Sequence, residues 1–233
     1  MKKFGAVFSM LLAVSLSGCL KVDQTLTINK DGSGQMEMSY SMQESTIRQM
    51  EAMSQMEAAQ GEEGSGSGAE QFEFNEEALR KQFAGAEERG IKVESIDSKT
   101  ESGWRTMHVK LSFKDLSALA GTEMMEDNVF SLKKNAKGNY VLVQKTGEEG
   151  AEAGDEAMPP EMMAQMAPMF AGMRIVQRVK VPGKVVSTNA TENDGSTASW
   201  IFDIDKDPAV INKIQNLKME IEFEGSGLDL KEI

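Results

Sequence analysis

The stretch KVDQTLTINKDGSGQMEMSYSM, residues 21 to 42, has the pattern of a β-hairpin. Its first half places Val22, Leu26 and Ile28 in one phase of a period-two alternation. After the turn the alternation resumes at Met36, Met38, Tyr40 and Met42. Asp31-Gly32 between the two halves is a strong signal for a tight hairpin turn. We therefore expect the fold to begin with two adjacent antiparallel strands.

The chain upstream of this hairpin has the layout of an export signal. In residues 1 to 18, Lys2 and Lys3 precede an apolar segment that is too short to span a bilayer. Leu16-Ser17-Gly18-Cys19 resembles the bacterial lipobox, in which a signal peptidase cuts before a diacylglyceryl cysteine. Cys19 is the only cysteine of the 233-residue chain, so it has no partner for an intrachain disulfide. We predict cleavage after Gly18 and lipidation of Cys19.

Lipidation determines where the rest of the chain resides. Acyl chains on Cys19 exceed what stable anchoring requires, and no other stretch approaches the roughly 18 apolar residues of a membrane span. Residues 19 to 233 are therefore predicted to form an exported domain, attached to the membrane of the cell envelope through its first residue. In a cell with two membranes, Leu20 after the cysteine resembles the default signal for sorting to the outer membrane, on its periplasmic or surface side.

Charge excludes one class of partner. The formal net charge is −12, and it becomes −14 when Lys2 and Lys3 leave with the signal. A strongly acidic chain repels nucleic acid and anionic lipid headgroups, so we expect no nucleic-acid partner and no electrostatic attachment to the membrane. Because Cys19 is used for lipid, the domain has to be held together by burial of its core.

The remaining sequence alternates between strand and helix patterns. Strands are predicted at 91–99, 104–113, 129–134, 139–146, 174–189, 197–205 and around Met219, Ile221 and Phe223. Helices are predicted at 43–59, from Asn75 to Gly90, at 115–120, at 160–173 and after Asp207-Pro208. Short connections between neighbouring strands favour antiparallel meanders. We therefore predict one large α+β domain, built from antiparallel β-meander hairpins with the helices packed on one face.

Two segments have compositions that are typical of loops. They are residues 61–70, GEEGSGSGAE, and residues 147–157, GEEGAEAGDEA. Both consist mainly of glycine, serine, alanine and acidic residues and contain little that a core would bury. We predict that both are flexible loops outside the core.

Two stretches resemble a known family. CLKVDQTLTINKDGSGQMEM, residues 19 to 38, is similar to the start of LppM-type bacterial lipoprotein domains. VKVPGKVVSTNATENDGSTASWIFDI, residues 179 to 204, resembles a later strand pair of that family, with its Pro-Gly-Lys-Val step, an Asn, an Asp-Gly turn and a Trp. The resemblance implies an anchored extracytoplasmic domain with a lipid-binding role, and it carries over no catalytic residue.

Methionine is unusually frequent, with 18 residues, and it recurs at helical spacing in two segments. The stripes consist of Met50, Met53 and Met56 in the first segment and of Met162, Met166, Met169 and Met173, with Phe170 beside them, in the second. Such stripes have three interpretations: a buried face filled by an adaptable residue, a deformable surface for partners of varying shape, or thioether capture of Cu(I).

The catalytic groups that an enzyme needs are scarce. His108 is the only histidine, and the alternation places it on a polar strand face beside Lys110. A zinc site lacks a second histidine, and neither a nucleophile elbow nor a phosphate loop occurs. A glycosidase-type carboxylate pair stays open, although the acidic residues cluster in loop-like runs.

We predict a non-catalytic binding module, without cofactor or metal, whose methionine stripes bind an apolar or amphipathic partner. That partner is a lipid or an envelope protein. The alternatives are a purely structural scaffold lipoprotein, a Cu(I)-binding protein and an enzyme.

Overall fold

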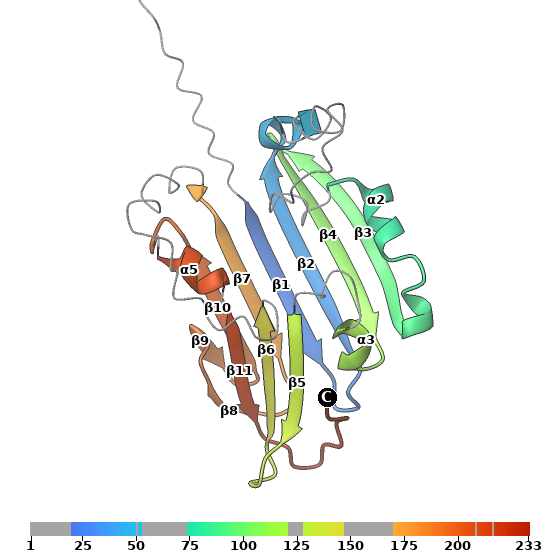
Figure 1. The fold of residues 1–233 in the computed structure, drawn as a ribbon, viewed down its shortest axis with the longest axis vertical. Helices are drawn as coiled ribbons and strands as arrows, with labels where there is room; N and C mark the ends of the chain where they lie inside the picture. The colour runs from blue at the N-terminus through green and yellow to red at the C-terminus, as the bar shows by residue number, and fades with distance from the viewer. Residues whose placement is uncertain are drawn as a thin grey trace, which may run out of the picture.

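The computed structural model describes residues 20–49, 51–52, 74–120, 128–146, 170–207, 209–215 and 217–233. Within them the chain forms two β-sheets with a few short helices (Figure 1). The predicted loops 61–70 and 147–157 lie outside the described residues, as do the later part of the predicted helix 43–59 and residues 160–169 of the second methionine segment.

The larger sheet has seven strands in the order β3-β4-β2-β1-β7-β10-β9. These strands are β1 (Lys21–Ile28), β2 (Gly34–Gln43), β3 (Ile91–Glu101), β4 (Trp104–Phe113), β7 (Arg174–Lys180), β9 (Glu192–Asp194) and β10 (Thr197–Asp203). The smaller sheet has four strands in the order β5-β6-β11-β8. They are β5 (Asn128–Lys134), β6 (Tyr140–Thr146), β8 (Val185–Thr188) and β11 (Lys218–Phe223).

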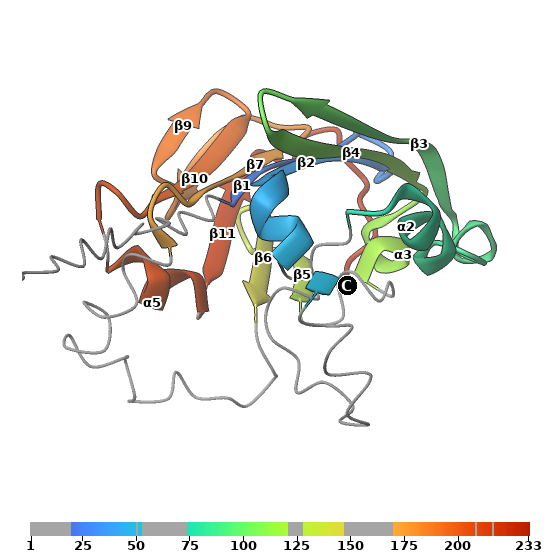
Figure 2. The same cartoon turned by 90° about the horizontal axis from the view of Figure 1, so that it is seen from above.

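The opening hairpin forms as its sequence pattern predicts, and it lies in the middle of the large sheet. β1 and β2 pair antiparallel from Lys21 opposite Ser41 to Ile28 opposite Gly34. The alternation places the apolar phase of both strands on one face, which we call the inner face because it is turned toward the small sheet (Figure 2). The opposite, more polar face is the outer face. Both sheets therefore contribute to one hydrophobic core.

The predicted meander is correct only for strands that are neighbours in the sequence. β1–β2, β3–β4, β5–β6 and β9–β10 are antiparallel hairpins. β1, however, pairs in parallel with β7, a strand from the last third of the chain. Alternation indicates which face of a strand is buried, but it does not indicate which strand lies beside it. The predicted antiparallel meander therefore does not hold at this pair.

The described helices are short and do not form the expected covering layer. They are α2 (Glu76–Gln82), the 3₁₀ helix η1 (Glu87–Arg89), α3 (Leu116–Ala120), α5 (Val210–Gln215) and a helix that begins at Glu44. α2 lies beside the edge strand β3, α3 lies near β5 and α5 lies near β10 (Figures 1 and 2). The small sheet, rather than a layer of helices, packs in front of the lower part of the inner face.

The start of α2 confirms that the predicted helix begins at Asn75, which caps it. The Asn75 side chain accepts hydrogen bonds from the backbone N–H of Glu77 at 2.9 Å and of Ala78 at 3.1 Å. The helix ends at Gln82, before the predicted stop at Gly90. Gly90 instead ends η1, with a φ of 87° that suits glycine.

The predicted strand 174–189 divides into β7 and β8, which belong to different sheets. The chain bends at Pro182-Gly183, where the backbone approaches the end of β11 closely. A Cβ on Gly183 would lie 2.1 Å from the carbonyl oxygen of Glu224, so only glycine fits without a backbone shift. The Pro-Gly step of the family-like motif is thus the corner through which the chain passes from one sheet to the other.

Candidate functional site

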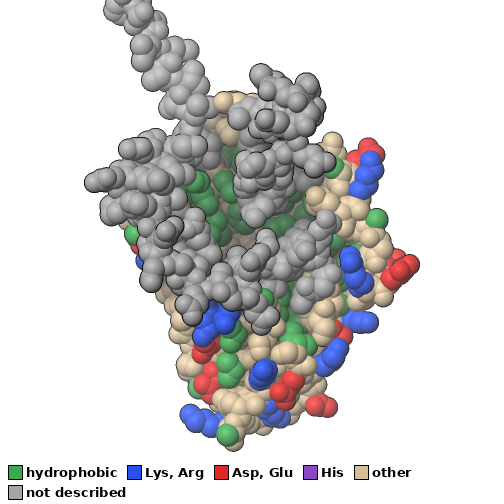
Figure 3. Space-filling view, in the orientation of Figure 1, with side chains coloured by type: hydrophobic (Ala, Val, Ile, Leu, Met, Phe, Trp, Pro, Cys, Tyr) green, Lys and Arg blue, Asp and Glu red, His purple; other side chains and the backbone are tan. Residues whose placement is uncertain are grey.

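The inner face of the large sheet carries rows of side chains that run across its strands. One row consists of Met107, Tyr40, Val22, Ile175 and Phe202. Another consists of Leu111, Met36, Leu26, Val179 and Ala198. All ten residues are buried and, apart from the tyrosine hydroxyl, apolar. Figure 3 shows hydrophobic side chains gathered on this side, with charged side chains toward the edge and the lower end.

The row between these two differs in both polarity and exposure. Met38, Gln24, Gln177 and Trp200 lie opposite one another on β2, β1, β7 and β10, and we call them the central row. Met38, Gln24 and Gln177 are only half-buried, whereas Val22 above and Leu26 below are 8% and 2% exposed. The middle of the inner face is therefore more accessible than the apolar rows on either side of it.

One atom of the central row lacks a polar contact. The side-chain oxygen Oε1 of Gln177 is buried and has no hydrogen-bond partner within the described part of the chain. An unpaired buried carbonyl costs about 1–3 kcal/mol, so such an atom in a native protein requires an explanation. A bound molecule with a hydrogen-bond donor is one such explanation.

These two glutamines are not among the candidate site residues predicted from the sequence, although the sequence contains a pattern that could have identified them. Gln24 stands between Val22 and Leu26 in the apolar phase of β1, and Gln177 stands between Ile175 and Val179 in that of β7. A polar residue in a buried phase is uncommon. Only the parallel pairing of β1 with β7 places the two glutamines side by side.

Of the predicted methionine stripes, only Phe170 and Met173 lie within the described residues. Met50, Met53, Met56, Met162, Met166 and Met169 lie outside them, as does Cys19. Phe170 and Met173 are half-buried and pack against the core at the entry to β7. The Met173 N–H donates to the Phe170 carbonyl at 2.9 Å, and the Met173 carbonyl accepts from Ile204 N–H at 3.2 Å.

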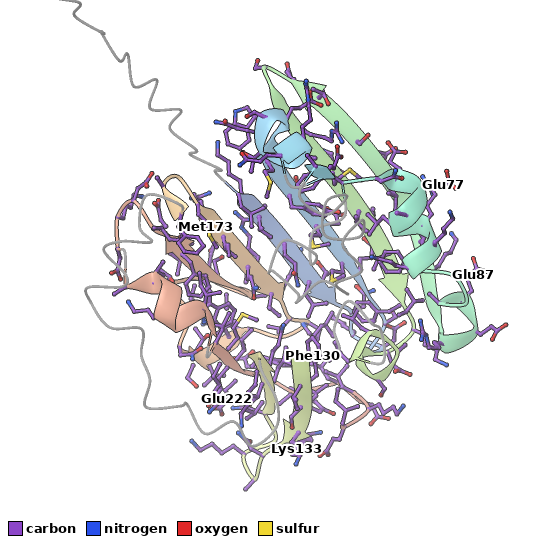
Figure 4. All side chains as sticks on the ribbon, turned by 45° about the horizontal axis from the view of Figure 1, so that its top comes forward. Glu77, Glu87, Phe130, Lys133, Met173 and Glu222 are labelled. Carbon is purple, nitrogen blue, oxygen red and sulfur yellow. The ribbon has the colours of Figure 1, made fainter. Side chains whose placement is uncertain are left out.

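Met173 marks one end of the large sheet, which we call the upper end. Here β1, β4 and β7 start, and β2 and β10 finish, as their registers require. The opposite, lower end contains the β1–β2 turn, the β5–β6 turn and residues 224–233. Figure 4 shows Met173 and Lys133 near these opposite ends of the molecule.

The upper end holds the first described residue in place. The carbonyl of Leu20 accepts a hydrogen bond from Arg174 N–H at 3.0 Å, and the Leu20 side chain packs against the core. Beside it the Lys21 Nζ lies over the Trp104 ring, 4.3 Å from the ring centroid, within the range of a cation–π interaction.

Two carboxylates of the upper end form ion pairs. Glu44 forms ion pairs of 2.9 Å with both Arg105 and Arg48, and hydrogen bonds from these two guanidinium groups lower the pKa of Glu44. Asp203 lies 3.3 Å from Lys206 and 4.0 Å from Arg174.

The Asn and Trp of the family-like motif join the two sheets. Asn189 Oδ1 accepts from Trp200 Nε1 at 3.1 Å and from Glu220 N–H at 2.9 Å, while its Nδ2 donates to the Lys218 carbonyl at 2.6 Å. Trp200 belongs to β10 of the large sheet and the other two partners belong to β11 of the small sheet. These motif residues therefore have a structural role that their sequence alone does not reveal.

His108 lies on the outer face, as its alternation predicts. It is exposed and borders a depression of about 310 Å³ together with Asp23, Glu37, Ser39 and Lys110. The Lys110 ammonium pairs with Glu37 at 2.7 Å, and Asp23 pairs with Arg178. This is a surface of exposed, mutually paired charges.

Two negative findings apply to the described ranges. No group of three or more His, Cys, Asp or Glu side chains there has the arrangement of a metal site. Among those same residues, no helix combines the length and hydropathy that crossing a membrane requires.

Comparison with known proteins gives a family match. The family model described as the LppM domain matches residues 21–210. A similar solved structure is the NMR structure of the folded domain of LppM from Mycobacterium tuberculosis. It shares 15% sequence identity over 89% of this chain and 91% of that chain, with a TM-score of 0.45. No curated protein matches the chain.

Proposed function

The chain belongs to the LppM domain family, and from that premise we propose that it is a lipid-anchored envelope protein that binds an amphipathic molecule without catalysis. The anchor is Cys19, whose lipobox precedes the first strand directly. The bound molecule is a lipid, held against the inner face of the large sheet. The observation that carries the binding proposal is the buried side-chain oxygen of Gln177 in the central row, which has no hydrogen-bond partner among the described residues.

The central row has the chemistry that the polar part of a lipid needs. Each glutamine amide offers two N–H donors and one carbonyl acceptor, and Gln24 and Gln177 are neighbours on parallel strands. Neither amide is charged, so the expected contacts are neutral hydrogen bonds to hydroxyl, ester or phosphate groups. A donor from the ligand would remove the cost of the unpaired Gln177 oxygen.

The surroundings of the central row suit the apolar part of the same molecule. The rows on either side are apolar, and Met38 is a flexible side chain within the central row itself. Phe170 and Met173 add half-buried apolar surface at the upper end. An amphipathic molecule therefore matches this face better than a purely polar one does.

The methionine stripes retain their proposed role in this function. Met50, Met53, Met56, Met162, Met166 and Met169 would complete the apolar surface around the ligand, since thioethers adapt to acyl chains of different shape. The alternative interpretation, in which the methionines bind Cu(I), predicts a different result. Titration with Cu(I) would then saturate at stoichiometric amounts.

The test is mass spectrometry of the material that copurifies with residues 20–233, produced without a lipid anchor and without detergent. We expect bound lipid in the wild type. Gln177→Leu should weaken its binding about 5- to 30-fold, which corresponds to the loss of a hydrogen bond of roughly 1–2 kcal/mol. Gln35→Leu is the matched control, because Gln35 is exposed on the outer face of β2.

Melting of each variant separates binding from folding. Gln177→Leu should melt at or above the wild-type temperature in lipid-free protein, because it removes an unpaired polar atom. Equal lipid content in Gln177→Leu and wild type would refute the role of the central row. A copurifying protein in place of lipid would favour a scaffold.

A further inference from the structure

The first strand of the large sheet begins almost immediately after the proposed lipid anchor. Lys21 starts β1, and Leu20 before it is already held by Arg174 N–H at 3.0 Å and by packing against the core. Cys19 is the preceding residue, and consecutive Cα atoms lie about 3.8 Å apart. A single peptide bond therefore separates the lipidated residue from Leu20, which leaves no length for a flexible linker.

Several strand ends meet at this upper end. Lys21 lies opposite Ser41 near the end of β2 and opposite Arg174 at the start of β7. Trp104, at the start of β4, lies opposite Gln43. Leu20 therefore lies at the same end of the large sheet as the starts of β4 and β7 and the end of β2 (Figure 1).

The side chains at this edge suit a lipid headgroup layer. Trp104 is half-buried and offers an apolar ring with one polar N–H, the combination that is enriched at membrane–water interfaces. Lys21 is exposed and extends over that ring with its ammonium 4.3 Å from the ring centroid. Long cationic side chains place their stems along apolar surface while the charge reaches water or headgroups.

Two acidic side chains at this edge are paired with cationic ones, although the net charge of the chain is −12. Glu44 is neutralised by Arg105 and Arg48, and Asp203 by Lys206 and Arg174. Attraction by the whole acidic chain is not required, since the anchor alone holds the domain at the surface.

We propose that the upper end of the large sheet rests on the lipid surface that holds Cys19, with Trp104 and Lys21 at headgroup level and β1 rising from the membrane. This proposal rests on the lipidation of Cys19 in the proposed function. Gln24 lies three residues beyond Lys21 along β1. At about 3.3 Å per residue, the central row is roughly 10 Å from the upper end, measured along the strand away from the membrane. A lipid can then reach the central row from the bilayer without crossing open water.

The test uses the full lipidated protein in phosphatidylcholine vesicles with either ordinary or brominated acyl chains. Bromine quenches tryptophan only at close range, and Trp104 and Trp200 are the two tryptophans of the chain. We expect stronger quenching in the wild type than in Trp104→Phe, because any quenching left in that variant reports only Trp200 of the central row, which is 3% exposed. Equal quenching of the wild type and of Trp104→Phe would overturn the proposal.

A second variant tests the same proposal without changing a residue of the folded domain. A Gly-Ser linker of about ten residues between Cys19 and Leu20 gives a root-mean-square separation of roughly 17 Å while leaving the domain sequence intact. Quenching should then fall to the level of the Cys19→Ser protein. Unchanged quenching would show that the short tether does not hold the sheet at the surface.

Flotation of the same vesicles distinguishes the two proposals. Wild-type protein that fails to float with the vesicles contradicts lipidation itself, and the orientation proposal fails with it. Protein that floats but is not quenched leaves lipidation standing and overturns the orientation alone.

Discussion

The strands of the large sheet have the same alternating pattern at both ends, but different residues cover the core at each end. At the lower end, the C-terminal residues are held by the small sheet: Ile233 exchanges two backbone hydrogen bonds of 3.1 Å with Leu132 of β5, and Tyr140 Oη of β6 accepts from Leu230 N–H at 3.0 Å. At the upper end, Leu20, Phe170 and Met173 are left half-buried. The C-terminal residues therefore close one end by backbone pairing, whereas the other end keeps apolar surface that a membrane or a lipid can cover.

This difference bears on the proposed function, in which stability and binding are located in separate parts of one core. The row of Leu26 and Val179 on the lower side of the central row is 2% and 3% exposed, while Val22 and Ile175 on the upper side are 8% and 9% exposed. Burial is thus most complete near the end that the C-terminal residues close. Substitutions at the lower end should mainly affect folding, and those at the central row should mainly affect binding.

The largest expected effect comes from Gly183→Ala at the lower end. Its new Cβ would lie 2.1 Å from the Glu224 carbonyl oxygen, so the sheet-to-sheet corner has to shift. We expect the free energy of unfolding to fall by about 3 kcal/mol, measured by urea denaturation. Lys184→Ala is the control, because its exposed side chain can be lost while the Lys184 carbonyl still accepts from Glu224 N–H at 2.9 Å. An equal effect of both variants would contradict the steric argument.

A smaller effect is expected from Tyr140→Phe, which removes the hydroxyl that holds the C-terminal residues. Leu230 N–H then loses a buried acceptor, so the free energy of unfolding should fall by about 1–2 kcal/mol. Hydrogen exchange should accelerate at residues 228–233 and stay unchanged at β1 and β7. Asp229→Asn, at an exposed position, serves as the control. Faster exchange at the upper end in Tyr140→Phe would show that the two ends are coupled.

The smallest effect is a pH dependence at Glu222 on β11. Hydrogen bonds from Asn139 Nδ2 at 2.8 Å and Asn135 Nδ2 at 3.0 Å lower its pKa from the ordinary value of 4.5. Because the folded-state pKa is the lower one, this stabilisation is complete above about pH 4.5 and is lost as the pH falls through the folded value. Glu222→Gln should flatten the acid side of the curve of unfolding free energy against pH. An unchanged acid limb would contradict this role of Glu222.

Local patterns in the sequence were sufficient for most individual elements. The hairpin of β1 and β2, the strands β3 to β6, the cap at Asn75 and the final strand β11 follow from alternation, turn chemistry and capping, which act between residues close in the chain. The likeness of two short stretches to the LppM family was also readable, and the family match confirms it. The lipidation of Cys19 and the role of the methionine stripes stay predictions.

Tertiary structure alone decided how these elements combine. Alternation in β1 cannot reveal its parallel neighbour β7, since a strand's partner depends on which segments meet during collapse and not on its own pattern. The corner at Gly183 depends on the approach of Glu224, a residue far along the chain. For the same reason the pairing of Gln24 with Gln177, and with it the candidate site, was visible only once β1 and β7 lay side by side. Sequence determined which face of each strand is buried, whereas long-range packing determined what that face meets.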